Sequence, residues 1–360
     1  MAEKAGVVVG MSGGVDSSVA AALLLEQGYR VFGVMVKVWR FGSGQPSDTG
    51  EDTLVHNAKR VAEQLGIPLT VIDAEKAFLR EVVQPFISGY LEGITPSPCP
   101  GCNRRLKGKI LLHIAEQQGL QFAATGHYAR VQTNPETGKR ELLKGIDSKK
   151  DQSYMLALMD HKDLERFIFP LGGLLKSDVR KIASKMGLMT AERRDSQDLC
   201  FLPEGNYREF LKRYAGRVIK PGEIVSTSGK VLGEHEGLPF YTIGQRKGIR
   251  VAAPQPLYVL RKDIQTNRLV VGELEELGYR QLVAREVNWI SGEIPTEAFR
   301  AEIKVRYQST SKWGLVIPNQ NGSATIQFDE RLRDITPGQV TVFYAGEKLL
   351  GGGVIDLARD

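Results

Sequence analysis

The residues with the clearest chemical meaning are Ser12-Gly13-Gly14-Val15-Asp16-Ser17-Ser18, which follow an apolar run and open a segment rich in alanine and leucine. This order predicts a strand, a glycine loop and a helix. Consecutive backbone N–H groups in such a loop, at a helix N-terminus, form a seat for phosphate, and serine hydroxyls add donors. The stretch lacks the lysine of a Walker loop and the spacing of a dinucleotide fingerprint. It therefore predicts a nucleotide site of another kind.

Asp16 is an acid within this expected anion site. A Mg²⁺ ion that bridges its carboxylate to the phosphates would remove the repulsion, because Mg²⁺ prefers carboxylate and phosphate oxygens. The alternative is that Asp16 caps the N-terminus of the helix. The sequence leaves both interpretations open.

The chain has only three cysteines, Cys99 and Cys102 in a CxxC pair and Cys200 about a hundred residues later. Three thiols cannot form a disulfide scaffold, and a CxxC pair in a cytosolic protein is more often metal-binding or redox-active. Arg104 and Arg105 follow Cys102 at the start of an expected helix. Because basic neighbours near a helix N-terminus lower the pKa of a thiol, we expect Cys102 to be a reactive thiolate. Cys200 could instead be a small buried hydrophobic residue.

Length, composition and charge exclude several classes of protein. The chain has 360 residues, of which 42% are hydrophobic and 25% charged, so we expect two or three folded domains and no disorder. Neither a signal peptide nor a run long enough to cross a bilayer is present, which predicts a cytoplasmic protein that does not engage a membrane. The net charge of +6 favours a polyanionic partner.

The first half of the chain alternates apolar strands with amphipathic helices, a pattern that predicts a parallel sheet. Ligands of such sheets bind outside the carboxyl ends of the strands. Met35 and Gly126 should therefore line the same crevice as the Ser12 loop and contact adenine. The expected strands are 31–38, 69–72 and 122–125, the expected helices are 19–25, 55–65 and 106–114, and 42–50 is an expected loop.

From about Gly216 the sequence pattern changes to short runs of β-branched residues separated by turns, which predicts an all-β region. We expect a catalytic domain over residues 1–205, a small, mainly β central domain over 206–278 and a C-terminal domain over 279–360. Basic residues recur across the middle of the chain and favour an RNA partner, with Arg180, Lys181 and Lys185 on one face of a helix capped by Ser177.

Several longer segments extend these patterns. They are GMSGGVDSS (Gly10 to Ser18), TPSPCPGCNRRLK (Thr95 to Lys107), ATGHYAR (Ala124 to Arg130), KDQSY (Lys150 to Tyr154), DSQDLCF (Asp195 to Phe201) and YTIGQRKG (Tyr241 to Gly248). The loop resembles the SGGxDS motif of the N-type ATP pyrophosphatases, which adenylate a carbonyl oxygen. Together the segments resemble one family over nearly the whole chain, the bacterial and organellar tRNA-specific 2-thiouridylases.

This resemblance implies a multidomain fold: an adenine nucleotide alpha hydrolase-like parallel sheet, a central domain and a C-terminal β-barrel. It implies ATP-dependent exchange of the C2 oxygen of the wobble uridine of tRNA for sulfur, with release of AMP and pyrophosphate. Cys102 would be the nucleophile and Cys200 would carry the persulfide. The implied ATP site is Gly10, Met11, Ser12, Gly13, Gly14, Val15, Asp16, Ser17, Met35 and Gly126. The implied tRNA contacts are Ser97, Pro98, Cys99, Lys150, Asp151, Gln152, Arg306 and Tyr307.

At Ser97 this chain departs from the family, which has asparagine there, so one amide fewer is available to read the uracil edge. Two sulfur steps stay open. In one, a Cys200 persulfide supplies sulfur and Cys102 attacks it, leaving a disulfide. In the other, Cys99, Cys102 and Cys200 hold a four-iron, four-sulfur cluster whose fourth iron carries a sulfide.

The sulfur donor would be a persulfide carrier protein or inorganic sulfide. Two other functions remain to be weighed. One is another ATP pyrophosphatase that ligates a small carboxylate, which leaves the cysteines unexplained. The other is a nucleotide-gated RNA-binding protein without catalysis, in which Cys102→Ser would be harmless.

Overall fold

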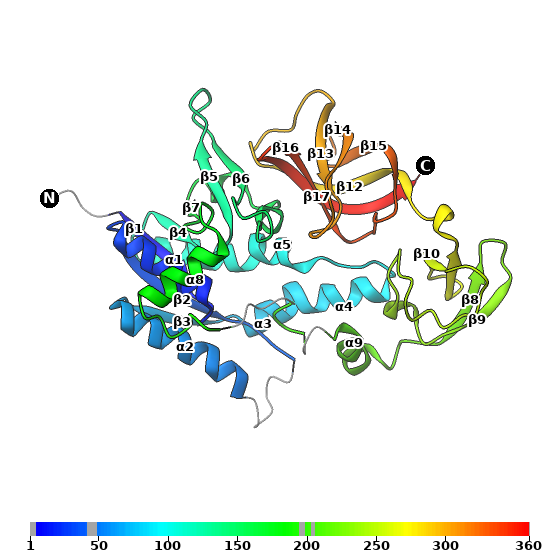
Figure 1. The fold of residues 1–360 in the computed structure, drawn as a ribbon, viewed down its shortest axis with the longest axis horizontal. Coiled ribbons are helices and arrows are strands. Elements are labelled where there is room, and N and C mark those ends of the chain that lie inside the picture. The colour runs from blue at the N-terminus through cyan, green and yellow to red at the C-terminus, as the bar shows by residue number, and fades with distance from the viewer. Residues whose placement is uncertain (1–4, 42–48, 194–198, 203–205, 360) are drawn as a thin grey trace.

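The computed structural model describes residues 5–41, 49–193, 199–202 and 206–359 (Figure 1). Most of the expected loop 42–50 lies outside these residues, as do Arg194 and the Asp195–Asp198 part of the Cys200 segment. The expected boundary at 205 and 206 falls at the edge of the described part, and the domain limits stay predictions. Within the described part, no helix is long and apolar enough to cross a membrane.

The N-terminal domain contains the expected parallel sheet, with strand order β3-β2-β1-β4-β7. The apolar runs form its central strands because both faces of the sheet are covered by helices. Val7, Val8 and Val9 of β1 are fully buried. The strands are β1 (Gly6–Gly10), β2 (Arg30–Lys37), β3 (Leu69–Asp73), β4 (Phe122–Ala124) and β7 (Phe167–Ile168).

The three expected helices are present, and a further helical stretch over 75–91 was not expected; π-helical turns occur in that stretch and directly before α6 (Gly108–Gln117). The turn η2 (Asn103–Lys107) directly follows Cys102 and ends at Gly108, where an added Cβ would lie 2.6 Å from the Asn103 carbonyl oxygen. Such wide turns are frequent at functional sites. The helical segments of this domain are α1 (Val15–Glu26), α2 (Thr49–Leu65), α3 (Glu75–Phe78), η1 (Leu79–Val83), α4 (Gln84–Leu91), α5 (Pro98–Cys102), η2, α6 (Gly108–Gln117), η3 (Ser153–Leu156), α7 (His161–Leu164) and α8 (Lys176–Lys185).

The central region begins with α9 (Tyr207–Ala215) and continues as a sheet with strand order β10-β11-β8-β9. The predicted β-rich region from Gly216 onward is therefore confirmed. Its strands and short helices are β8 (Gly222–Ser226), β9 (Val231–His235), η4 (Leu238–Phe240), β10 (Tyr258–Asp263), β11 (Arg268–Gly272) and η5 (Leu274–Glu276).

The C-terminal strands run β12-β15-β14-β13-β16-β17, and the pairing of β12 with β17 closes them into the expected barrel. The hairpin of β5 (Ala129–Thr133) and β6 (Arg140–Lys144) belongs to the N-terminal half of the chain, yet β6 pairs with β17 and extends the barrel sheet (Figure 1). The barrel strands are β12 (Tyr279–Trp289), β13 (Phe299–Lys304), β14 (Lys312–Pro318), β15 (Ala324–Leu332), β16 (Val340–Ala345) and β17 (Lys348–Arg359).

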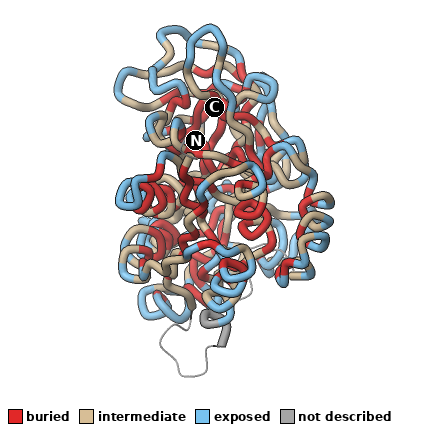
Figure 2. Tube along the Cα trace, turned by 90° about the vertical axis from the view of Figure 1, so that its left-hand side faces the viewer, coloured by how far each residue is buried: buried red, intermediate tan, exposed pale blue. Residues whose placement is uncertain are grey.

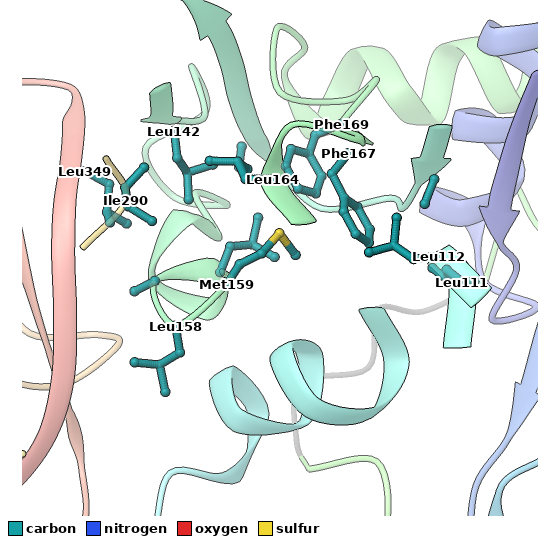
Figure 3. Packing of buried hydrophobic residues seen from close by; sticks show 14 of the residues in the cluster. Leu111, Leu112, Leu142, Leu158, Met159, Leu164, Phe167, Phe169, Ile290 and Leu349 are labelled. Carbon is teal, nitrogen blue, oxygen red and sulfur yellow. The ribbon is translucent and has the colours of Figure 1, made fainter. Parts of the chain in front are cut away.

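One hydrophobic cluster joins the sheet domain to the barrel. Leu111 of α6, Leu142 of β6 and Met159 pack in the same cluster as Ile290 and Leu349 of the barrel region (Figure 3). Buried segments accordingly run through the middle of the molecule, with exposed segments at the turns (Figure 2). Because this core is shared, the barrel is held against the face of the sheet domain that carries the site.

Candidate functional site

The predicted nucleotide loop connects the end of β1 to the start of α1. Gly13 has a φ of +72°, and a Cβ there would lie 2.6 Å from the Leu54 carbonyl oxygen, so glycine is required. The N-cap of α1 is Gly14, and no side chain caps the helix. The interpretation of Asp16 as a helix cap is therefore wrong, and its carboxylate serves another purpose.

The serines of the loop hold its shape. The Ser17 hydroxyl accepts from the Ser12 backbone N–H at 3.1 Å and lies 3.2 Å from the Ser12 hydroxyl. Ser17 and Ser18 hydroxyls both donate to the Gly14 carbonyl, at 3.1 and 2.9 Å. The loop is thus ordered by its own hydrogen bonds, which reduces the entropy lost when a phosphate binds.

The Asp16 carboxylate accepts three hydrogen bonds from two side chains. Lys176 Nζ donates to Asp16 Oδ1 at 2.7 Å and to Oδ2 at 2.8 Å, and the Tyr128 hydroxyl donates to Oδ1 at 2.7 Å. Lys176 is only 8% exposed. A carboxylate has about four acceptor positions, so these three bonds leave one on Oδ2.

Gly126 and Met35 follow the expectation to different degrees. A Cβ on Gly126 would lie 2.8 Å from the Asp16 carbonyl carbon and 2.9 Å from Ser17 N, so the end of β4 packs directly on the loop backbone. Met35 is 6% exposed and packs with Met11 in a core cluster beside the loop. Whether either contacts adenine stays a prediction.

The first two cysteines lie on α5, directly before the π-helical turn. Cys102 is buried, Cys99 is half-buried and Cys200 is exposed, so the interpretation of Cys200 as a buried hydrophobic residue is wrong. Lys107 interacts electrostatically with all three sulfurs, and the thiolate of Cys200 first, then those of Cys102 and Cys99, raise its pKa. The two cysteine segments therefore converge on one cation.

The expected low thiol pKa of Cys102 is wrong in sign. Burial raises the pKa of Cys102, and the positive charges of Lys107 and Arg105 offset this only in part. Burial raises the pKa of Cys99 to about 12. Desolvation of the charged form outweighs the basic neighbours because the sulfurs are inside the molecule rather than at its surface.

The donor set also bears on the cluster hypothesis. Among the residues that the structure describes, no group of three or more His, Cys, Asp or Glu side chains is close enough to hold a metal ion. A four-iron, four-sulfur cluster on Cys99, Cys102 and Cys200 is larger than a single ion and stays a prediction.

Asn103 holds α5, called the thiol helix below because it carries Cys99 and Cys102, against the rest of the site. Its amide nitrogen donates to the Met155 carbonyl oxygen at 3.0 Å and lies 3.4 Å from His127 Nε2. His127 Nδ1 lies 2.7 Å from the Thr125 hydroxyl, and burial lowers the pKa of His127 to about 4, so its ring is neutral at pH 7. Consecutive residues, Gly126 and His127, thus contact the nucleotide loop and the residue beside Cys102.

The predicted tRNA contacts lie where the barrel meets the thiol helix. Ser97 N–H donates to the Gly338 carbonyl at 3.0 Å, and Tyr154 packs against Tyr307 with ring centroids 5.7 Å apart. Arg306 is turned inward, donating to the Thr336 hydroxyl and to the Ile243 carbonyl. These contacts gather Ser97 and Tyr307 on one side of the site, whereas Arg306 links the barrel to the central region.

Asp151 and Gln152 use their side chains inside the protein. Asp151 Oδ1 accepts from the backbone of Gly145 at 2.9 Å and of Ser153 at 3.0 Å, and Gln152 Oε1 accepts from Tyr128 N–H at 3.0 Å. In the chain from Asp147 to Gln152, called the 147–152 segment below, Lys149 is exposed and Lys150 is half-buried. The segment's contact with RNA stays a prediction.

The expected basic helix face is only partly present. Helix α8 begins after Leu175, not at Ser177, and no side chain caps it. Arg180 donates to the carbonyls of Ala191 and Arg193, and Lys181 pairs with Asp178 at 3.0 Å. Arg180 is thus directed at its own domain.

Three family models match the chain in succession. They are a tRNA methyl transferase HUP domain over residues 5–204, a tRNA methyl transferase PRC-barrel domain over 208–273 and an aminomethyltransferase β-barrel domain over 279–355. Curated relatives match almost end to end. The tRNA-specific 2-thiouridylase MnmA of Moorella thermoacetica is 45% identical over 353 residues, which cover 97% of this chain and 99% of the relative. That of Geobacter metallireducens is 44% identical over 368 residues, which cover 99% of each. The chain belongs to the tRNA-specific 2-thiouridylase family.

Membership of the 2-thiouridylase family identifies the protein as an enzyme, and it favours neither the carboxylate ligase nor the non-catalytic RNA-binding alternative. Among solved structures, the U34-tRNA thiolase NcsA from Methanococcus maripaludis with its four-iron, four-sulfur cluster covers 59% of this chain and 67% of its own, at 18% identity and a TM-score of 0.35. A likeness at that level carries no argument about this chain.

Sequence reasoning missed two cations at the nucleotide loop of this 2-thiouridylase. Lys176 pairs with Asp16, and Arg193 Nη1 donates to the Gly13 carbonyl at 2.9 Å. Both belong to the basic residues that recur across the middle of the chain. Nothing in their spacing indicates that residues 160 and 180 positions further along would meet the loop, because those contacts depend on how the chain from α8 onward docks beside α1.

Proposed function

We propose that this protein catalyses ATP-dependent 2-thiolation of the wobble uridine of tRNA, and that it does so in the cytoplasm. One observation carries the proposal: Gly126 packs on the nucleotide loop while its neighbour His127 contacts Asn103, the residue after Cys102. This contact supports a site in which ATP binds close to Cys102, as activation followed by sulfur chemistry requires.

In the activation step, the uracil C2 oxygen attacks the α-phosphorus of ATP and pyrophosphate leaves. The loop N–H groups and Lys176 would stabilise the negative charge on the departing phosphates. Asp16, whose Oδ2 keeps one acceptor position, would hold a Mg²⁺ ion. When bound, that ion neutralises phosphate charge.

In the sulfur step, the terminal sulfur of a Cys200 persulfide attacks C2, and AMP leaves with the former C2 oxygen. The Cys102 thiolate, having lost its proton to solvent, then attacks the Cys200 sulfur. The persulfide S–S bond breaks, the base is released as 2-thiouridine, and a Cys102–Cys200 disulfide forms. A thiol reductant returns two electrons, and a sulfur donor restores the persulfide.

The exposures of the two cysteines support this division of roles. Exposed Cys200 is accessible to a persulfide carrier protein, whose outer sulfur it can accept without an added oxidant, whereas buried Cys102 is sheltered from such a donor. Lys107 interacts with both sulfurs, and its charge lowers the pKa of Cys102 against the larger opposing effect of burial. The cluster alternative requires Cys99, Cys102 and Cys200 to hold one metal group together, and the test below distinguishes it from the persulfide step.

The test combines metal analysis with a thiolation assay. The full chain is purified without oxygen, its iron and acid-labile sulfide are measured, and it is supplied with ATP, a sulfur source and a tRNA bearing a wobble uridine. A tRNA with cytidine at the wobble position is the control substrate. We expect thiolation without iron, retained in Cys99→Ser and abolished in Cys102→Ser and Cys200→Ser when a persulfide donor is supplied.

Two other results would change the proposal. About four iron atoms per chain, with activity that follows iron content and is lost in Cys99→Ser, would replace the persulfide step by the cluster step. No thiolation with either sulfur source, with or without iron, would overturn the proposed function itself.

A further inference from the structure

Tyr128 connects two parts of the site that have separate tasks. It is 2% exposed, and its backbone makes two hydrogen bonds with one residue: Gln152 Oε1 accepts from Tyr128 N–H at 3.0 Å, and Gln152 N–H donates to the Tyr128 carbonyl at 2.8 Å. Its hydroxyl donates to Asp16 Oδ1 at 2.7 Å. A single rigid ring therefore spans the distance from the 147–152 segment to the nucleotide loop.

A second connection runs in parallel to the first. Lys176, which holds both oxygens of Asp16, donates its backbone N–H to Asp147 Oδ2 at 2.9 Å. Asp147 lies at the start of the 147–152 segment, and Gln152 lies at its end. Both partners of Asp16 are thus attached to the same short stretch of chain.

Because Tyr128 and Lys176 are both hydrogen-bonded to the 147–152 segment, the pairing of Asp16 depends on where that segment lies. The ring of Tyr128 also lies under the Lys176 ammonium, 5.8 Å from Nζ to the ring centroid, so the two partners of Asp16 are packed against each other. A displacement of the segment changes the Asp16 contacts from both sides. It would thereby change whether the Lys176 ammonium interacts mainly with Asp16 or with a bound phosphate.

The same segment presents cations to a polyanion. Lys149 is exposed, and its backbone N–H is anchored by Asp147 Oδ1 at 3.1 Å, so a phosphate that contacts Lys149 acts on the residue that also holds Lys176. A ligand shifts an equilibrium only if it interacts differently with the two arrangements. RNA phosphates on this segment have that property, because the contacts they form depend on where the segment lies.

We propose that Tyr128 is a positioning residue that couples RNA bound at the 147–152 segment to Asp16, so that ATP is cleaved efficiently only when RNA is in place. The inference rests on the proposed function and adds an order of events to it. An adenylating enzyme that waits for its RNA avoids futile hydrolysis of ATP.

The experiment compares Tyr128→Phe with Tyr207→Phe in the full chain. Tyr128→Phe keeps the ring and both backbone hydrogen bonds and removes only the hydroxyl. Tyr207→Phe is the matched control, because its hydroxyl donates to the Phe240 carbonyl at 3.0 Å in the central region, and this bond has no link to Asp16. For each variant we would measure the hydrolysis of ATP to AMP with and without the wobble-cytidine tRNA, which is bound but not thiolated, together with the KM for ATP, the Kd for tRNA and the melting temperature.

We expect the wild-type rate of AMP formation to rise at least tenfold when the tRNA is added. In Tyr128→Phe this ratio should fall to near one, through kcat and not through the Kd for tRNA, and Tyr207→Phe should keep the wild-type ratio. Gln152→Ala, which removes the acceptor of the Tyr128 N–H, should lower the ratio too. The double variant should be no worse than the more affected single variant, since both interrupt one connection.

Each other result has a defined meaning. An unchanged ratio in Tyr128→Phe overturns the coupling, as does a wild-type enzyme that thiolates wobble-uridine tRNA yet hydrolyses ATP equally fast with and without the wobble-cytidine tRNA. A loss that follows only a weaker Kd for tRNA or a lower melting temperature assigns Tyr128 a purely structural role. A wild-type protein that produces neither AMP nor 2-thiouridine means that the proposed function has failed, and the coupling fails with it.

Discussion

The nucleotide loop and the thiol region are built in opposite ways. The loop is one continuous stretch whose serines satisfy its carbonyls and whose acid is held by Lys176 and Tyr128. The thiol region combines two distant segments, one buried and one exposed, and burial opposes the charged form of its nucleophile. The loop is ordered before its ligand binds. In the proposed reaction, by contrast, Cys102 must lose a proton and Cys200 must exchange its bonding partner.

The largest expected effect comes from removing the charge of the loop acid. Asp16→Asn leaves the shape of the side chain but weakens its pairing with Lys176, so AMP formation should fall about 100-fold or more. Rapid-quench measurement of AMP checks this. Asp178→Asn is the control, because Asp178 lies on the same helix as Lys176 but pairs with exposed Lys181, and this variant should stay within twofold of wild type. Equal losses in both variants would contradict the assignment of Asp16.

The thiol region should show a pH dependence that the loop lacks. Because burial raises the pKa of Cys102, its thiolate is scarce at pH 7, and the sulfur step should accelerate about tenfold per pH unit until the pH reaches that pKa. Single-turnover thiolation from a preloaded persulfide, measured from pH 7 to 9, tests this, while AMP formation over the same range should change much less.

Lys107 sharpens that test. Lys107→Met removes the charge that favours the Cys102 thiolate and should slow the sulfur step further at pH 8, whereas Lys109→Met should not. Lys109 is the matched control because it is half exposed and pairs with Asp163 at 2.6 Å on the outside of the helix. A pH-independent sulfur step in wild type would show that proton loss from Cys102 is not limiting.

Close packing of the β4 end on the loop gives a third, smaller effect. Gly126→Ala places a Cβ within 3 Å of the Asp16 and Ser17 backbone, so the loop must shift and kcat/KM for ATP should fall about tenfold. Gly173→Ala is the control, since a Cβ there meets nothing within 4 Å. Steady-state kinetics decide the matter. Wild-type kinetics in Gly126→Ala would show that the loop tolerates displacement.

The smallest effect concerns stability where the hairpin meets the barrel. Hydrogen bonds from Asn134 and then Lys348 lower the pKa of Glu141 from 4.5 to about 2. Its stabilising contribution is therefore present above pH 4.5 and is lost as the pH falls toward 2. Glu141→Gln should cost about 1 kcal/mol at neutral pH and lower the melting temperature by about 2 °C. The difference from wild type should shrink at pH 3, and a constant difference would contradict this origin.

The sequence predicted what is local and missed what is assembled across the fold. The strands, the glycine loop and the closed barrel follow from periodicity, turn residues and the family pattern. The pairing of Lys176 with Asp16 could not be predicted, because the two residues are 160 positions apart and meet only after α8 docks. The pKa of Cys102 was misjudged for a related reason: neighbours in sequence supply charge, but burial depends on the whole core.

The pairing of β6 with β17 bears on how the molecule folds. The barrel closes on itself through β12 and β17, yet its sheet continues into a hairpin that is synthesised long before the barrel. Until the barrel forms, β6 is an open edge with unpaired N–H and C=O groups, the kind of template that recruits strands from other chains. A chain truncated after the central region should therefore aggregate instead of yielding a separable ATP-binding fragment, and the last strand of the protein acts as an internal safeguard against self-association.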